Sequence, residues 1–163
     1  VPAQVGRNHV VHCLDAYQRR RGLQKIRARG ISMSLGSFMR KTSLIPVISD
    51  FLFDQPREVI RELSHLNATH DVFLVLIDCA FVYDLPAMSA GWVEMSDVET
   101  GRTEVLPRAA VAQLGQRARE WQDEVERMAK DSDLDVLRLG IDDRHDVAAL
   151  TEFVATRRLR KDP

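Results

Sequence analysis

Residues 43–50 read SLIPVISD, a compact apolar run that ends in two polar residues. This pattern is typical of a buried parallel strand that opens into a loop. Pro46 lies within the run, and because proline has no N–H for a sheet ladder it is confined to edge strands, strand starts and bulges. Two further apolar runs, over residues 72–77 and 134–141, predict two more buried strands.

Helical patterns separate the three predicted strands. After the first strand, Asp54 or Gln55 can cap a helix that has Pro56 at its first position. A longer helix precedes the third strand and has apolar residues three or four positions apart, and another helix follows that strand. Near the start of the chain we expect a first helix with Val10, Val11 and Leu14 and a short second helix with Leu35. The stripe of the longer helix comprises Val111, Leu114, Ala118, Trp121, Val125 and Met128.

Apolar strands that alternate with helices need right-handed crossovers. The sequence therefore predicts an α/β fold, a doubly wound and mostly parallel sheet with helices on both faces. Residues 91–106 interrupt this order with alternating strands around a turn at residues 99–102, which predicts a β-hairpin. A chain of 163 residues predicts a single domain over residues 1–163.

Charge and composition exclude several classes of function. The net charge of -1 removes the whole-domain electrostatic argument for a nucleic-acid partner. The longest apolar run is far shorter than the roughly 18 residues that a membrane span needs, so we expect no membrane segment. Cys13 and Cys79 lie far apart and indicate neither a disulfide framework nor a zinc site. We expect a cytoplasmic protein.

Carboxylates follow the ends of all three predicted strands. Asp50, Asp78 and Asp142 stand at the carboxyl edge of the sheet, where ligands bind in open α/β folds. With Ser49 they define a candidate strand-end loop site. Such oxygen ligands suit magnesium, which would allow a phosphoester hydrolase. Each Asp can equally cap the turn or helix that follows it, as can Asp143.

Several short motifs together carry a family resemblance. They are Ser49-Asp50-Phe51 after the first strand, Gly6-Arg7-Asn8-His9 before the first helix, Leu85-Pro86, the Asp97-x-Glu99-Thr100-Gly101 turn and Arg157-Arg158 in the closing helix. In order and spacing, the chain resembles the domain-of-unknown-function-58 family along nearly its whole length. These bacterial and archaeal proteins are related to von Willebrand factor A domains.

The resemblance implies a degenerate metal-ion-dependent adhesion site. Asp50 matches the later aspartate of that site, and Ser32 or Ser34 can replace the threonine, since the family's glycine-threonine step resembles Gly30-Ile31 here. The Asp-x-Ser-x-Ser loop occurs nowhere in the chain, so the domain is expected to lack its N-terminal strand and metal-site loop. We expect no cofactor, and magnesium only if the upstream loop is present.

The resemblance also implies a role. Family genes commonly accompany those of MoxR-type AAA+ ATPases, which implies a non-enzymatic protein-interaction or adaptor module with such a partner. The alternative is a magnesium-dependent phosphoester hydrolase. Since the first strand of the fold would be missing, the strand over residues 44–48 should have one open side. We expect Ile45 and Val47 to pair with the neighbouring strand, Pro46 to face the open side, and the first helices or a second copy to cover the margin.

Overall fold

Three parallel strands form the central sheet, in the order β1-β2-β5. They are β1 (Leu44–Ser49), β2 (Asp71–Ile77) and β5 (Asp135–Leu139), so the three predicted strands are confirmed. The structure is a computed structural model and describes residues 6–19, 31, 35, 39, 41–83, 91–97, 101–140 and 143–161. β2 pairs with a strand on each side, which explains why its apolar residues are uninterrupted and buried.

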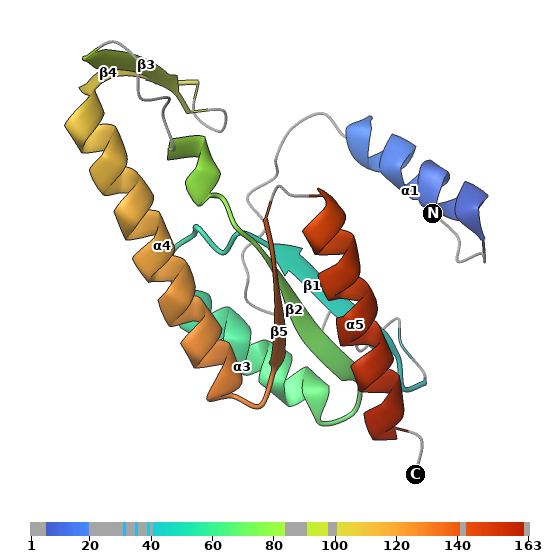
Figure 1. Ribbon diagram of the computed structural model, residues 1–163. Helices are drawn as coiled ribbons and strands as arrows, with labels where there is room; N and C mark the ends of the chain where they lie inside the picture. The colour runs from blue at the N-terminus through green and yellow to red at the C-terminus, as the bar shows by residue number, and fades with distance from the viewer. Residues whose placement is uncertain are drawn as a thin grey trace.

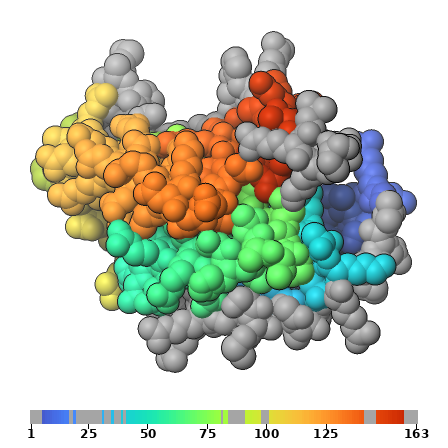
Figure 2. Space-filling model, turned by 90° about the horizontal axis from the view of Figure 1, so that it is seen from below, coloured from blue at the N-terminus to red at the C-terminus, as the bar shows by residue number. Residues whose placement is uncertain are grey.

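Helices cover both faces of this sheet (Figure 1). On one face lie α3 (Pro56–Asn67) and α4 (Arg108–Lys130), and Figure 2 shows them packed side by side. Their apolar residues enclose the core with alternate residues of β2. That core contains Val59, Ile60, Leu63, Val72, Leu74, Leu76, Val125 and Ala129. The long apolar stripe thus docks on the sheet, and the predicted α/β architecture is confirmed.

The opposite face carries α5 (Asp143–Lys161). Phe153 of this helix packs on Phe73 of β2, with 5.1 Å between the ring centroids. Arg157 donates hydrogen bonds to the carboxylates of Asp71 and Asp135, and its guanidinium lies 4.9 Å from the Phe73 ring centroid. One cation therefore fastens the last helix to β2 and β5 at once.

The start of α3 differs in one detail from the expectation. Pro56 occupies the first turn as predicted, and the capping position is Gln55. However, the Gln55 side chain makes no capping hydrogen bond, and its backbone is left-handed, with φ 64°. The fixed φ of Pro56 and the buried apolar stripe define this helix start instead of a side-chain cap.

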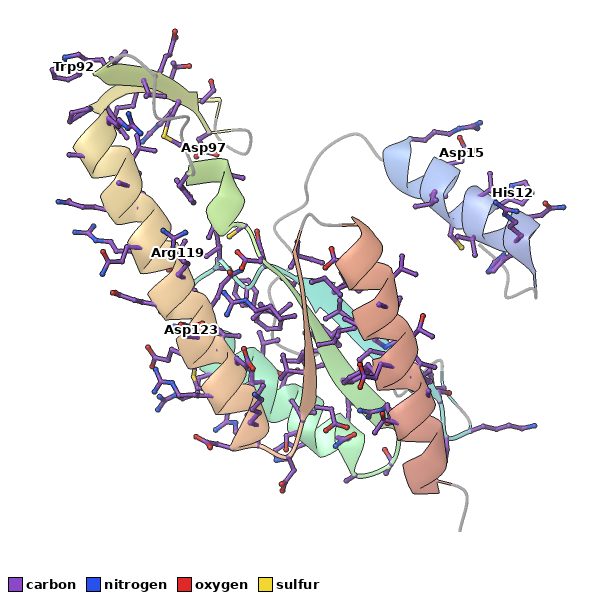
Figure 3. The ribbon with its side chains drawn as sticks, viewed as in Figure 1. His12, Asp15, Trp92, Asp97, Arg119 and Asp123 are labelled. Carbon is purple, nitrogen blue, oxygen red and sulfur yellow. The ribbon has the colours of Figure 1, made fainter. Side chains whose placement is uncertain are left out.

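The predicted hairpin is confirmed and stands apart from the sheet at the amino end of α4 (Figure 1). It comprises β3 (Trp92–Ser96) and β4 (Thr103–Pro107), and the Ser96 and Thr103 hydroxyls lie 2.8 Å apart. Trp92 points outward at its end (Figure 3). The short helix η1 (Ala80–Tyr83), which follows β2, was not predicted.

β1 lies at the edge of the sheet, as Pro46 predicts. The Asp71 N–H donates to the Ser43 carbonyl at 2.9 Å. Since alternate residues of a parallel strand address the same neighbour, Ile45 and Val47 also address β2 and Pro46 addresses the open side. The missing N–H of Pro46 therefore costs the ladder nothing, and the expected pairing is confirmed.

The first helix does not cover this margin. α1 (Arg7–Gln18) lies on the β1 side of the molecule (Figures 1 and 2), but Leu44 and Ile48 remain 59% and 66% exposed. The expected covering by the first helix is therefore wrong. Most of the predicted helix around Leu35 falls outside the described residues, and covering by a second copy stays a prediction. None of the described helices is long and apolar enough to cross a membrane.

Candidate functional site

The first strand end forms a turn that its own polar side chains stabilise. Ser49 Oγ accepts a hydrogen bond from the Phe51 N–H at 3.0 Å, and Asp50 Oδ1 accepts one from the Leu52 N–H at 3.2 Å. The Asp50 side chain is otherwise exposed. Ser49 and Asp50 therefore hold the backbone of the loop that follows β1.

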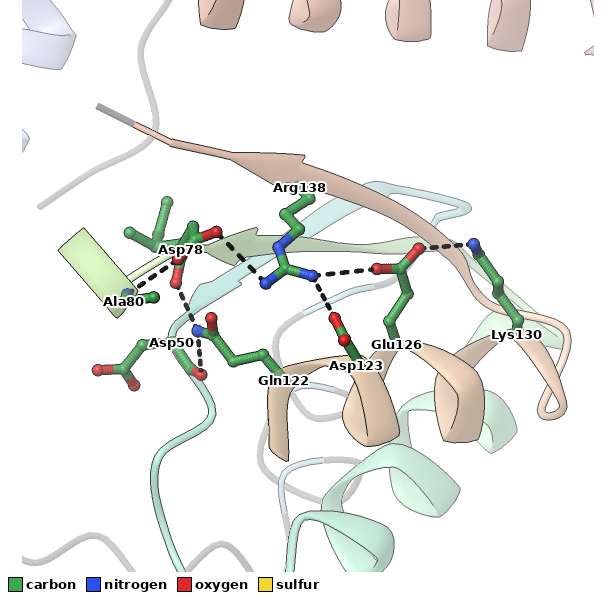
Figure 4. A network of polar contacts seen from close by, with 9 residues as sticks. Asp50, Asp78, Ala80, Gln122, Asp123, Glu126, Lys130 and Arg138 are labelled. Atoms are coloured by element: carbon green, nitrogen blue, oxygen red, sulfur yellow. Dashed lines mark hydrogen bonds and ion pairs between the residues drawn. The ribbon is translucent and has the colours of Figure 1, made fainter. Parts of the chain in front are cut away.

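Asp78 at the second strand end is engaged through both carboxylate oxygens (Figure 4). Its Oδ1 accepts from the Ala80 N–H at 2.9 Å, and its Oδ2 lies 3.3 Å from a guanidinium nitrogen of Arg138 on β5. Arg138 also contacts Asp123 of α4 at 2.6 Å. Partial burial alone would lower the pKa of Arg138, but the hydrogen bond to Asp123 and the charge of Asp78 outweigh it and raise that pKa.

Gln122 of α4 joins the ends of the first two strands. Its side chain is fully buried, and its amide nitrogen donates to the carbonyls of Asp50 at 3.1 Å and Ile77 at 2.8 Å. Next to it, the Trp121 indole N–H donates to the Phe51 carbonyl at 2.8 Å. Helix α4 thereby positions the loop after β1 through two adjacent side chains.

Sequence reasoning missed this role of α4, because Trp121 was assigned only to the apolar stripe. A signal was present in the spacing: Gln122 stands four residues after Ala118 and three before Val125, both in the stripe. A polar residue at such a position must find buried partners.

The loop over residues 51–55 presents apolar side chains beside a groove. Phe51 is buried at 1% exposure, whereas Leu52 and Phe53 are 42% and 37% exposed. The groove has a volume of about 370 Å³ and is open to solvent. It is lined by Leu52, Phe53, Asp54, Tyr83, Leu114, Arg117, Ala118 and Trp121.

Neither nucleophile near this loop is activated. Burial, followed by the negative charge of Asp50, raises the pKa of the Cys79 thiol above its usual value. Burial likewise raises the pKa of Tyr83, followed by the negative charge that Cys79 gains when it ionises and by the charge of Asp50. Both groups are held in their protonated forms, which are poor nucleophiles.

The described residues bring only part of the predicted site together. Ser49, Asp50 and Asp78 lie at one edge of the sheet, as expected. Asp97 belongs to the hairpin, where its carbonyl accepts from the Gly101 N–H at 2.7 Å. Five of the predicted site residues fall outside the described part of the chain, namely Ser32, Ser34, Glu99, Thr100 and Asp142.

The part of the chain that the structure describes does not fit a divalent cation. No three His, Cys, Asp or Glu side chains gather there in a way that could hold a metal ion. Asp78 is neutralised by Arg138, and Asp50 offers a single exposed carboxylate. At this edge of the sheet, α4 holds the loop after β1 by hydrogen bonds, and Arg138 pairs with the Asp78 carboxylate. A largely apolar groove lies beside the loop.

Comparison with known proteins identifies a family to which the chain is similar. A family model described as "Protein of unknown function DUF58" matches residues 1–128. None of the curated proteins and none of the solved structures matches the chain. The resemblance was expected over nearly the whole chain, but the match ends within α4, before β5 and α5 begin.

Proposed function

Since residues 1–128 match the DUF58 model, the chain belongs to the DUF58 family, and on this premise we propose that it is a non-enzymatic protein-interaction or adaptor module. We propose that its sheet is part of a von Willebrand factor A-like domain. The partner class implied by the resemblance is a MoxR-type AAA+ ATPase.

The loop over residues 51–55 is the observation that carries this proposal. Leu52 and Phe53 are exposed although the residues around them are tightly held, since Phe51 is buried and its carbonyl bonds to Trp121. Single exposed apolar side chains are common, but adjacent ones beside a groove form a patch of the kind that marks binding surfaces. A rigid display of two apolar side chains suits recognition, because little ordering entropy is lost on binding.

The strand-end carboxylates support the hydrolase alternative less well than the exposed loop supports the adaptor proposal. A phosphoester hydrolase of this kind needs acidic side chains that converge with free oxygens on one ion. Asp78 is instead committed to the Ala80 N–H and to Arg138. Turnover of a generic phosphodiester with magnesium, lost in both Asp50→Asn and Asp78→Asn, would support the enzyme and contradict the adaptor.

The proposal is tested by reconstitution with a purified MoxR-type ATPase encoded in the same genome. Binding is measured by calorimetry for the wild-type chain, for Leu52→Ser with Phe53→Ser, and for Val147→Ser as an exposed apolar control on α5. We expect the loop variant to bind at least tenfold more weakly and the control to bind like wild type. No binding by wild type contradicts the ATPase as partner, and equal binding by the loop variant contradicts the loop as the surface.

A further inference from the structure

The groove beside the loop has two unlike walls. One wall is a single stripe of α4, with Leu114, Arg117, Ala118 and Trp121 at helical spacing. The other wall comprises residues 52–54 and Tyr83. Because the groove is open along its length, it suits an extended or helical segment of another protein better than an enclosed small molecule.

The loop wall is held in a conformation that side chains rarely adopt. Phe51 and Gln55, at its two ends, have φ values of 55° and 64°. Such left-handed residues other than glycine are unfavourable and persist where the surroundings determine them, often at binding sites. At Phe51 this conformation is stabilised by two hydrogen bonds from α4. Trp121 donates to the Phe51 carbonyl, and Gln122 donates to the Asp50 carbonyl.

The groove also carries two opposed charges. Arg117 is exposed on the α4 wall and makes no hydrogen bond or ion pair with any described residue. Asp54 lies on the loop wall. A segment in the groove would place an acidic group toward Arg117 and away from Asp54, which fixes its orientation as well as its charge.

We propose that this groove takes a short partner segment in which a leucine or aromatic side chain has an aspartate or glutamate within two residues of it. The inference rests on the proposed interaction function and specifies the chemistry of the partner. The apolar side chain packs between Phe53, Tyr83 and Trp121, and the acidic group pairs with Arg117. The walls provide apolar area for the first contact and a cation for the second.

The test is selection of random 12-residue peptides on the full chain, followed by affinity measurement by fluorescence polarisation. We expect selected peptides to combine an apolar residue with a nearby acidic one. Arg117→Glu should weaken their binding at least tenfold, and Phe53→Ser should do the same. Arg127→Glu, an exposed charge reversal at the other end of α4, should leave it unchanged.

A second selection sharpens the result. Peptides selected on the Arg117→Glu variant should carry lysine or arginine in place of the acidic residue. Peptides that depend on Phe53 but show no acidic preference would overturn the inference and leave the interaction function standing. Peptides indifferent to Phe53, or no selected peptide at all, would also overturn it, while the ATPase experiment separately decides the proposed function.

Discussion

Gln122 is a polar residue at a position where the helix faces the core. Its amide nitrogen satisfies two backbone carbonyls at once, but its Oε1 is buried and has no partner in the described part of the chain. The two hydrogen bonds from the nitrogen tie the ends of β1 and β2 to α4. A buried carbonyl left without a donor is costly.

Replacing Gln122 by leucine should therefore destabilise the protein by about 2–3 kcal/mol, since two carbonyls lose their donor. The measurement is urea unfolding followed by circular dichroism. Gln113→Leu, at an exposed position of the same helix, should change the free energy of unfolding by less than about 0.5 kcal/mol. Similar values for the two variants would contradict the bracing role of Gln122.

At the scale of elements, the start of α3 depends on a backbone conformation that glutamine adopts poorly. Gln55 is exposed, makes no capping bond and has a left-handed backbone. Gln55→Gly should raise the free energy of unfolding by about 0.5–1 kcal/mol, because glycine reaches this region without a steric penalty. Gln55→Val should lower it, since a β-branched side chain suits this region worst. Thermal unfolding of the three proteins checks the order, and a glycine variant less stable than wild type would refute the reasoning.

The attachment of α5 rests on Arg157. Its guanidinium and the Asp71 carboxylate are both largely buried, so removal of the cation takes away the ionic partner of a buried carboxylate. Arg157→Leu should cost about 3–5 kcal/mol. Asp71→Asn in the same chain should restore part of this loss, whereas Arg61→Leu, an exposed change on α3, should have little effect. Denaturant titration measures the wild type, Arg157→Leu, Asp71→Asn, the double variant and Arg61→Leu, and additive losses in the double variant would contradict the pairing.

The elements were largely predictable, and their long-range polar contacts were not. The apolar runs at residues 44–48 and 72–77 predict strands because burial on both faces leaves a continuous pattern. Pro46 even indicates which strand lies at the edge. The role of Gln122 depends on Asp50, which lies 72 positions earlier in the chain, and that of Arg157 depends on Asp71, which lies 86 positions earlier. No local pattern encodes such a pairing, and the groove beside the loop arises only when α4 packs there.

At the scale of the whole molecule, β1 is an edge strand of the sheet that the described residues form. Leu44 and Ile48 lie exposed beside it, so a second copy of the chain can pair or pack there. We expect concentration-dependent association of the wild-type chain in sedimentation velocity. Ile48→Lys should reduce it, and Val147→Lys on the exposed part of α5 should not. A strictly monomeric wild type would contradict association through this edge.

The contact between Arg157 and Asp71 also bears on how the protein emerges during synthesis. Asp71 leaves the ribosome 86 residues before its cation does. Until then Asp71 lacks the guanidinium of Arg157, and before residue 135 emerges β2 has no β5 beside it. The nascent chain up to residue 128 contains everything that the family model matches but lacks β5 and α5. We therefore expect its sheet to be incomplete at that stage. When the last helix follows, Arg157 reaches the carboxylates of Asp71 and Asp135 and fastens α5 to β2 and β5.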